Sequence, residues 1–158
     1  MTEHEKDPTD WTVDAPAEAD FPAWRQLYQG YADFYRTPLP DENADRVWSW
    51  LMDPEHEVRG LLVRGEDGVP VGLAHYRPFA RPLHTSIGGF LDDLYVDPEA
   101  RGSGAVDALF GRLREITAEQ GWSVLRWITA EDNYRARAKY DQVAKETSWV
   151  TYDLTPGG

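Results

Sequence analysis

One segment in the second half of the chain has the residue types and spacing of a phosphate-binding loop. It runs from Leu94 to Gly104 as Leu-Tyr-Val-Asp-Pro-Glu-Ala-Arg-Gly-Ser-Gly, and a helix is predicted to begin at its end. Glycine lets the backbone adopt positive φ, so that several N–H groups can point toward one place. The free N–H groups and the dipole of the helix start favour a phosphate there, and the cationic Arg101 adds to that field. The segment therefore predicts a pyrophosphate-binding loop.

The segment differs from two common phosphate-binding loops. No GxxxxGK[ST] motif is present, which excludes a P-loop, and the third glycine and distal acidic residue of a dinucleotide-binding motif are missing. A tight turn whose glycines serve only a steric need is the alternative interpretation of this segment.

A second segment favours the functional interpretation. The residues from Asn133 to Tyr140 open a predicted helix, with Asn133 at its N-cap position. Asn133, Ala136 and Tyr140 are spaced i, i+3, i+7 and share one face of that helix. Ala136 permits a close approach, and Tyr140 can present its hydroxyl group to the same cleft.

With these two segments the sequence resembles the GNAT superfamily of N-acetyltransferases over about residues 11–154. The strand-Pro-Arg-Gly-x-Gly-helix segment looks like the acetyl-CoA pyrophosphate motif of that superfamily, and the 133–140 segment looks like its second CoA-side helix. Within the superfamily the chain is most similar to the spermidine/spermine (diamine) and thialysine acetyltransferase branch. The features that carry this similarity are Phe34-Tyr35 before Pro38, Gly72-Leu73-Ala74, and the stretch from Phe90 to Val96.

The resemblance implies acetyl-CoA as co-substrate and assigns roles to individual residues. The acyl carbonyl would run along the strand that ends at Val96, with a backbone N–H near Tyr95 or Val96 holding the developing oxyanion. Tyr140 would protonate the departing thiolate. Val106 stands where the family usually has Gly or Ala, and it predicts a more crowded phosphate loop. The residues expected to contact the cofactor are Leu94, Tyr95, Val96, Arg101, Gly102, Ser103, Gly104, Ala105, Val106, Asn133, Ala136 and Tyr140.

Acetyl transfer to an amine also requires a group that removes a proton from the acceptor. A free alkylammonium has a pKa near about 10.4, so a carboxylate must take its proton, directly or through water. Asp92 and Asp93 are adjacent on one predicted strand and should point to opposite faces unless a bulge intervenes. The resemblance favours Asp92, Asp93 is the alternative, and Glu131 and Asp132 are a reserve pair. The four histidines have no metal-ligand spacing and the chain has no Cys, so no metal site is predicted.

The elements that must position these residues follow from the periodicity of the apolar side chains. Helical spacing and strand-like alternation predict an α/β fold, with a mixed sheet and helices on its faces. The GNAT resemblance implies a mostly antiparallel central sheet flanked by helices on both faces. The predicted elements are strands at 11–13, 58–64, 69–76, 86–96, 123–129 and 148–154, and helices at 20–35, 42–52, 104–119 and 133–143.

Composition limits the class of partner. The chain has 158 residues and a net charge of −12, which argues against nucleic acid or an anionic membrane as the main partner. No apolar run approaches the ~18 residues of a membrane span. We expect residues 1–10 to form an acidic, partly disordered leader and residues 11–158 to form a single N-acetyltransferase domain. A cytoplasmic location is expected, and the resemblance implies a homodimer.

The sequence thus predicts an acetyl-CoA-dependent N-acetyltransferase acting on the primary amine of a small cationic acceptor, a polyamine or a lysine-like molecule. Two alternatives stay open. One is a protein lysine or N-terminal acetyltransferase, and the other is an acyl-CoA-binding module that does not transfer.

Overall fold

The computed structural model describes residues 10–157. The described residues divide into two compact parts, one up to Trp127 and one from Ile128 onward, and each is described on its own. Residues 1–9 of the predicted acidic leader lie outside the described residues.

The first part is built on a sheet of five strands in the order β1-β2-β3-β4-β5. Neighbouring strands are antiparallel from β1 to β4, and β5 runs parallel to β4. This confirms the prediction of a mixed, mostly antiparallel sheet. β3 is longer than predicted, and β5 is reduced to two residues of the predicted 123–129 strand. The strands are β1 (Thr12–Asp14), β2 (Arg59–Arg64), β3 (Pro70–Arg81), β4 (Ser86–Val96) and β5 (Leu125–Arg126).

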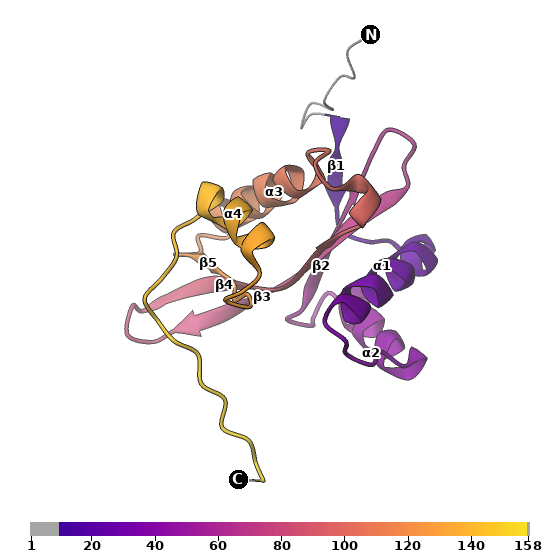
Figure 1. Ribbon diagram of the computed structural model, residues 1–158. Helices are drawn as coiled ribbons and strands as arrows, with labels where there is room; N and C mark the ends of the chain where they lie inside the picture. The colour runs from indigo at the N-terminus through magenta and orange to yellow at the C-terminus, as the bar shows by residue number, and fades with distance from the viewer. Residues whose placement is uncertain (1–9, 158) are drawn as a thin grey trace. The chain divides into compact units, whose positions relative to one another are not determined.

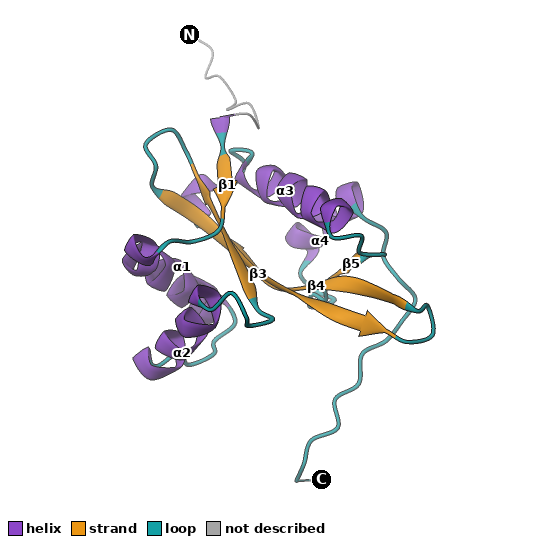
Figure 2. Cartoon of the chain, turned by 180° about the vertical axis from the view of Figure 1, so that it is seen from behind, coloured by secondary structure: helices purple, strands orange, loops and turns teal. Residues whose placement is uncertain are grey.

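Helices cover both faces of this sheet, as predicted. α1 (Phe21–Phe34) and α2 (Asp41–Met52) lie on one face, and α3 (Ala105–Glu119) lies on the other (Figures 1 and 2). The apolar side chains of each helix recur every three or four residues, so each helix buries one stripe against the sheet. Short 3-10 turns at Glu18–Asp20 and Pro98–Ala100 precede α1 and α3.

The core on the α1 side joins these layers. Trp24 and Leu27 of α1 and Ala44 of α2 pack against Leu62 of β2 and Leu73 of β3, all of them buried. Tyr95 of β4 packs against the same cluster. Burial of apolar area on this scale is the main force that fixes α1 over the middle strands.

Gly30 sets the distance between α1 and β4. A Cβ atom at Gly30 would lie 2.5 Å from the hydroxyl oxygen of Tyr95, closer than two such atoms can approach. A side chain at position 30 would therefore displace the hydroxyl end of Tyr95 or push the helix away from it. Asp20 stands at the N-cap position of α1, but its side chain forms an ion pair with Arg64 and accepts a hydrogen bond from the Ala17 N–H instead of capping the helix.

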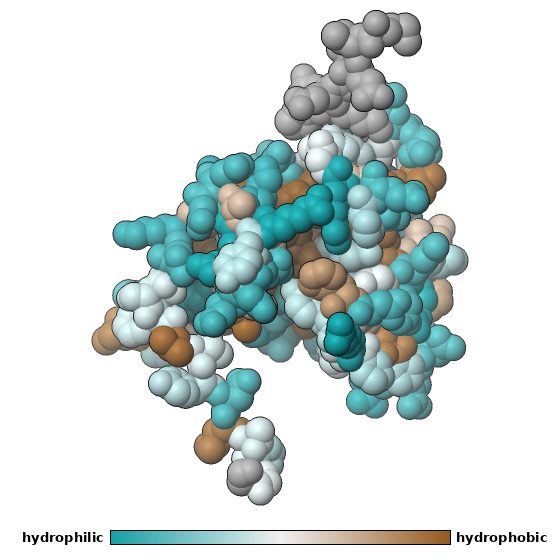
Figure 3. All heavy atoms as spheres, in the orientation of Figure 1, coloured by the Kyte–Doolittle hydropathy of each residue, from teal (hydrophilic) through white to brown (hydrophobic). Residues whose placement is uncertain are grey.

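The second part contains one helix, α4 (Tyr134–Val143), among residues 128–157. The prediction of a strand at 148–154 is wrong, because these residues pair with no strand in the described chain. Their apolar side chains are exposed, from 74% for Val150 to 99% for Leu154. Figure 3 shows hydrophobic, brown spheres in this C-terminal segment. The alternation of residue types that predicted a strand is present, but the described chain supplies no neighbouring strand.

No helix among the described residues is long and apolar enough to cross a membrane.

Candidate active site

The predicted phosphate loop joins β4 to α3. Pro98–Ala100 form a single 3-10 turn, which the Asp97 carboxylate closes by accepting a hydrogen bond from the Glu99 N–H at 3.0 Å. Gly102 and Gly104 then adopt φ values of +78° and +95°. Side chains with a Cβ atom rarely adopt this conformation, so the two glycines are what let the chain turn into the helix.

The loop presents unpaired backbone donors. Within residues 10–157, the N–H groups of Gly102, Gly104, Ala105 and Val106 have no hydrogen-bond partner. No side chain caps α3, and the Arg101 side chain is exposed beside these N–H groups. Free N–H groups at a helix start with an adjacent cation form an anion site, so the residues fit the pyrophosphate of a CoA molecule. The backbone N–H group of Val106 is one of these free donors, whatever the size of the side chain at that position.

Trp11 anchors the loop, which sequence reasoning did not foresee. Its indole N–H donates a hydrogen bond to the backbone carbonyl of Ser103 at 3.1 Å, across 92 positions of the chain. The Ser103 hydroxyl is turned inward and donates to the carbonyl of Ala100. Ser103 therefore helps to hold the loop in shape, and nothing in the sequence pairs it with Trp11.

A β-bulge lies at the predicted catalytic carboxylates. His75 of β3 pairs with Asp93 and the next residue, Tyr76, pairs with Leu91, so Asp92 is an extra residue on β4. The side chain of Asp93 contacts His75, and that of Asp92 contacts Arg77. His75 and Arg77 are two positions apart on β3 and share a face of the sheet. The bulge therefore brings both carboxylates to the side of the sheet that α1 covers, whereas a regular strand would separate them.

Asp93 belongs to a buried chain of hydrogen bonds. The indole N–H of Trp24 donates to His75 Nε2 at 3.0 Å, and His75 Nδ1 lies 2.8 Å from Asp93 Oδ2. An indole can only donate, so Nε2 is the unprotonated nitrogen and Nδ1–H donates to Asp93. These two hydrogen bonds fix the ring of His75, which is only 2% exposed, in one orientation and one tautomer. The Tyr28 hydroxyl donates a further hydrogen bond to Asp93 Oδ2 at 3.0 Å.

The surroundings of the two carboxylates shift their pKa values in opposite directions. Burial by itself would raise the pKa of Asp93, but the hydrogen bonds from His75, Tyr31 and Tyr28 outweigh it, and the pKa lies below its ordinary value. Burial raises the pKa of Asp92, and the like charge of Asp93 adds to this, although Arg77 opposes it. Asp93 is therefore the carboxylate that stays ionised, and Asp92 is the one better matched to accept a proton.

Asp92 is the more accessible of the two. Its side chain is 32% exposed, against 18% for Asp93. Its Oδ2 lies 3.0 Å from the Nε of Arg77, whose guanidinium group stacks 4.9 Å from the Phe90 ring. The ion pair holds Asp92 in place without burying it.

Tyrosine rings from α1 line the same side of the sheet. Tyr28 and Tyr31 stack with their ring centroids 5.9 Å apart, and Tyr35 continues the row at 4.9 Å from Tyr31. Burial and then the charge of Asp93 raise the pKa values of Tyr28 and Tyr31, so both hydroxyl groups stay protonated. Aromatic faces beside an ionised carboxylate suit a cation.

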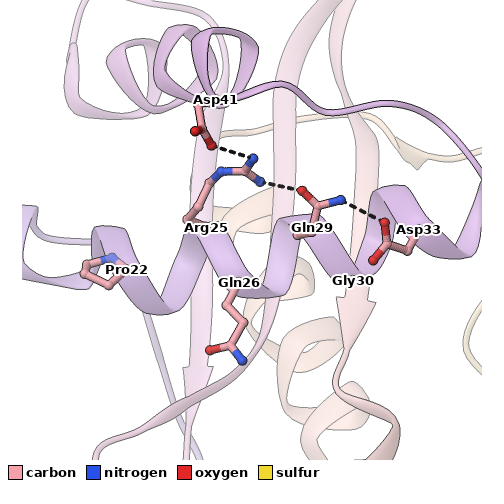
Figure 4. Close-up of a pocket in the computed structure, with 7 residues that line it drawn as sticks. All are labelled: Pro22, Arg25, Gln26, Gln29, Gly30, Asp33 and Asp41. Atoms are coloured by element: carbon pink, nitrogen blue, oxygen red, sulfur yellow. Dashed lines mark hydrogen bonds and ion pairs between the residues drawn. The ribbon is translucent and has the colours of Figure 1, made fainter.

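An open groove of about 490 Å³ lies on the other flank of α1 (Figure 4). Arg25 binds Asp41 at 3.1 Å and the Leu39 carbonyl at 2.8 Å, which ties the α1–α2 connection to the helix. Gln29 and Asp33 extend this row of contacts along α1. Arg25, Gln29, Asp33 and Asp41 are engaged with one another here, so most of the polar lining of the groove serves the anchoring of α2.

The remaining predicted residues lie on the second part. Asn133 is at the N-cap position of α4, but its side chain donates to the Thr129 hydroxyl at 3.4 Å instead of capping the helix. Ala136 and Tyr140 are partly buried and follow on the same face of α4. Glu131, one of the reserve pair, is exposed in the turn before α4, and its backbone carbonyl accepts a hydrogen bond from Arg137.

The model of the acetyltransferase (GNAT) family matches residues 24–144. The chain belongs to the GNAT family. Among its relatives, the D-amino-acid N-acetyltransferase HPA3 of Saccharomyces cerevisiae is 31% identical over 141 residues, covering 89% of this chain and 88% of that protein. The thialysine N-epsilon-acetyltransferase of Caenorhabditis elegans is 29% identical over 97 residues, covering 57% of this chain and 58% of that protein. The solved structure of the aminoglycoside N-acetyltransferase AAC(6')-Iy in complex with CoA superposes with a TM-score of 0.80 at 15% identity, covering 92% of this chain and 95% of that one.

Family membership fixes the general chemistry of this GNAT protein. It is an N-acetyltransferase that uses acetyl-CoA as co-substrate and acts on amines. The mixed sheet with helices on both faces is the GNAT fold.

Proposed function

We propose that this GNAT enzyme acetylates the primary amine of a small cationic acceptor, a polyamine or a lysine-like molecule. The observation that carries the proposal is the pair of carboxylates at the β4 bulge. Asp93 is kept ionised by its hydrogen-bonded neighbours, Asp92 is accessible beside it, and tyrosine rings lie on the same side of the sheet. An ionised carboxylate next to aromatic faces attracts an ammonium group, and a second carboxylate can accept its proton.

The acceptor enters as an ammonium ion and must lose one proton before it can attack. In the proposed reaction Asp92 takes this proton, directly or through water. The amine nitrogen then forms a bond to the thioester carbonyl carbon and the C–S bond breaks. The Tyr140 hydroxyl gives its proton to the leaving sulfur, and the second proton that the nitrogen loses after it has bonded to carbon replaces it by way of solvent. The products are an N-acetylated amine and CoA thiol, and one proton is released from Asp92.

We assign the positioning of the co-substrate to the loop, to the end of β4 and to α4. The free N–H groups at Gly102, Gly104, Ala105 and Val106, with Arg101, would hold the pyrophosphate. The end of β4, Leu94 to Val96, would align the acetyl group, and Asn133, Ala136 and Tyr140 of α4 would contact the CoA arm. Much of the rate is expected to come from this alignment.

The names of the relatives support a small acceptor without specifying it. The yeast relative is named for D-amino acids and the nematode relative for thialysine, both of which are small molecules bearing an amine. The net charge of −12 favours cationic acceptors by long-range attraction.

Thiol release from acetyl-CoA by the purified protein tests the proposal. The panel comprises spermidine, spermine, thialysine, lysine, an aminoglycoside and a basic peptide. We expect release with one class of small amine and little release with the peptide. Release with the peptide alone would move the acceptor to proteins and overturn the proposal. Binding of acetyl-CoA with no release in the whole panel would favour a non-catalytic acyl-CoA-binding module.

We also propose that the protein works as a homodimer of single-domain chains in the cytoplasm, where acetyl-CoA is available. The exposed apolar side chains at 149–154 support self-association, because exposed apolar groups of this kind favour contact with another chain. Sedimentation or light scattering of the full chain, compared with a chain ending at residue 147, tests this. A monomer in both cases would contradict it.

A further inference from the structure

Arg77 places a positive charge in the proposed acceptor site, next to its carboxylates and tyrosines. It lies on β3 one position beyond Tyr76, the residue at which β2 stops pairing with β3. Its side chain is 33% exposed, and its face of β3 is the one that carries His75. A positive charge here would repel a polycation, so its presence needs an explanation that the proposed reaction does not supply.

The hydrogen bonds of Arg77 leave part of its guanidinium group free. Only Nε contacts Asp92, at 3.0 Å from Oδ2 and 3.3 Å from Oδ1. Within the described residues the two terminal nitrogens have no hydrogen-bond partner. The group is held at one edge by Asp92 and on one face by the Phe90 ring, 4.9 Å away. A planar fork with fixed orientation and free terminal N–H groups matches the geometry of a carboxylate.

We infer that Arg77 binds the carboxylate of the acceptor, which narrows the proposed class from polyamines and lysine-like molecules to α-amino acids, lysine among them, acetylated at the α-amine. The inference rests on the proposed acetylation of a small amine at Asp92. Asp92 would receive the ammonium group and the free terminal nitrogens of Arg77 would receive the carboxylate. Because Asp92 itself contacts Nε of the same guanidinium group, the two binding points are no farther apart than that group is wide. An acceptor whose amine and carboxylate stand on one carbon matches this short separation.

Phenylalanine and 2-phenylethylamine test this, because they differ only in the carboxylate. Both enantiomers of the amino acid are assayed with the wild type and with Arg77→Met, which keeps an unbranched stem and removes the charge. Arg81→Met is the matched control on the same strand, since the Arg81 guanidinium group binds the Ser123 hydroxyl at 2.8 Å. The readouts are kcat and KM, measured separately for each acceptor.

We expect the wild-type kcat/KM for one enantiomer of phenylalanine to exceed that for 2-phenylethylamine by tenfold or more. A charged hydrogen bond in a partly buried site contributes a difference of this size. Arg77→Met should lower kcat/KM for the amino acid by about 10–100-fold more than for 2-phenylethylamine, mainly through KM, because any loss that comes from freeing Asp92 is shared by both acceptors. Arg81→Met should leave both values unchanged.

Equal use of the two acceptors by the wild type would overturn the inference. An equal loss for both acceptors in Arg77→Met would also overturn it, because Arg77 would then act only by holding Asp92. Acetylation of spermidine or 2-phenylethylamine with no acetylation of phenylalanine would refute the inference while the proposed function stands. Failure with every amine would refute the proposed function itself.

Binding of the product gives a readout that is independent of turnover. N-acetylphenylalanine keeps the carboxylate and has no ammonium group, so its affinity reports on Arg77 without Asp92 as a partner. Calorimetry should show binding to the wild type that weakens by about tenfold or more in Arg77→Met. An unchanged affinity would overturn the inference.

Discussion

Replacing Trp24 by Phe should destabilise the protein through His75. The indole N–H is the donor to His75 Nε2, and within the described residues every buried side-chain nitrogen and oxygen has a hydrogen-bond partner. The variant leaves Nε2 buried without a donor, which costs about 1–3 kcal/mol. Trimming the indole to a benzene ring removes roughly 40 Å³, and at about 24 cal/mol per Å³ of cavity this adds about 1 kcal/mol. The free energy of unfolding should therefore fall by about 2–4 kcal/mol, which leaves a typical domain folded.

A double-mutant cycle with His75→Leu separates the hydrogen bond from the packing. Urea unfolding is measured for the wild type, Trp24→Phe, His75→Leu and the double variant. In the His75→Leu background the cost of Trp24→Phe should shrink to the packing contribution, giving a coupling energy of about 1–3 kcal/mol. A coupling energy below about 0.5 kcal/mol would refute the reasoning, since such values are the ordinary scatter of independent sites. The ¹⁵N shifts of His75 add a second check, with Nδ1 protonated and Nε2 unprotonated in the wild type.

Three further predictions concern the site. Gly102→Ala should weaken acetyl-CoA binding measured by calorimetry, because Gly102 has φ +78° and an alanine there strains the loop. Gly68→Ala, at φ +77° and with equally open surroundings, should share the stability cost and leave acetyl-CoA affinity unchanged. Equal affinities in both variants would argue against the proposed phosphate loop. Tyr140→Phe should lower kcat strongly in steady-state assays with acetyl-CoA affinity nearly intact, and an unchanged kcat would remove Tyr140 from the reaction. A base works only when deprotonated, and burial raises the pKa of Asp92 above 3.8, so kcat should decline on acidification at a higher pH than an ordinary aspartate would give. Asp92→Asn should lower kcat and abolish this acidic limb of the pH profile. An acidic limb that persists in Asp92→Asn would assign it to another group.

Local sequence patterns predicted a helix or strand well where that element and the elements that bury its apolar side chains lie in the same described part of the chain. The stripe from Trp24 to Tyr31 predicted α1, and Ser86–Val96 has the bounds predicted for its strand. The segment at 148–154 has a strand-like composition and no strand, because a strand exists only when another strand accepts its hydrogen bonds. Sequence alone does not reveal whether such a neighbour is present.

The local conformation of the proposed site follows from the sequence, whereas the long-range contacts that join its parts do not. The conformation of the proposed phosphate loop follows from two glycines and a helix start, which are local features. The bulge at Asp92 depends on the register of β3 against β4, so the sequence could only leave Asp92 and Asp93 as alternatives. The hydrogen bonds from Trp24 to His75 and from Trp11 to Ser103 join residues 51 and 92 positions apart, and no local pattern announces them.

The most direct test of acetyl transfer is to measure both products of one reaction. The purified chain is incubated with acetyl-CoA and phenylalanine, lysine or spermidine, and CoA thiol and N-acetylated amine are quantified together by absorbance and mass spectrometry. The account predicts that the two products appear in equal amounts with at least one of these amines, and much more slowly with Asp92→Asn. Thiol without acetylated amine, or acetyl-CoA binding with neither product from any of the three, would contradict it.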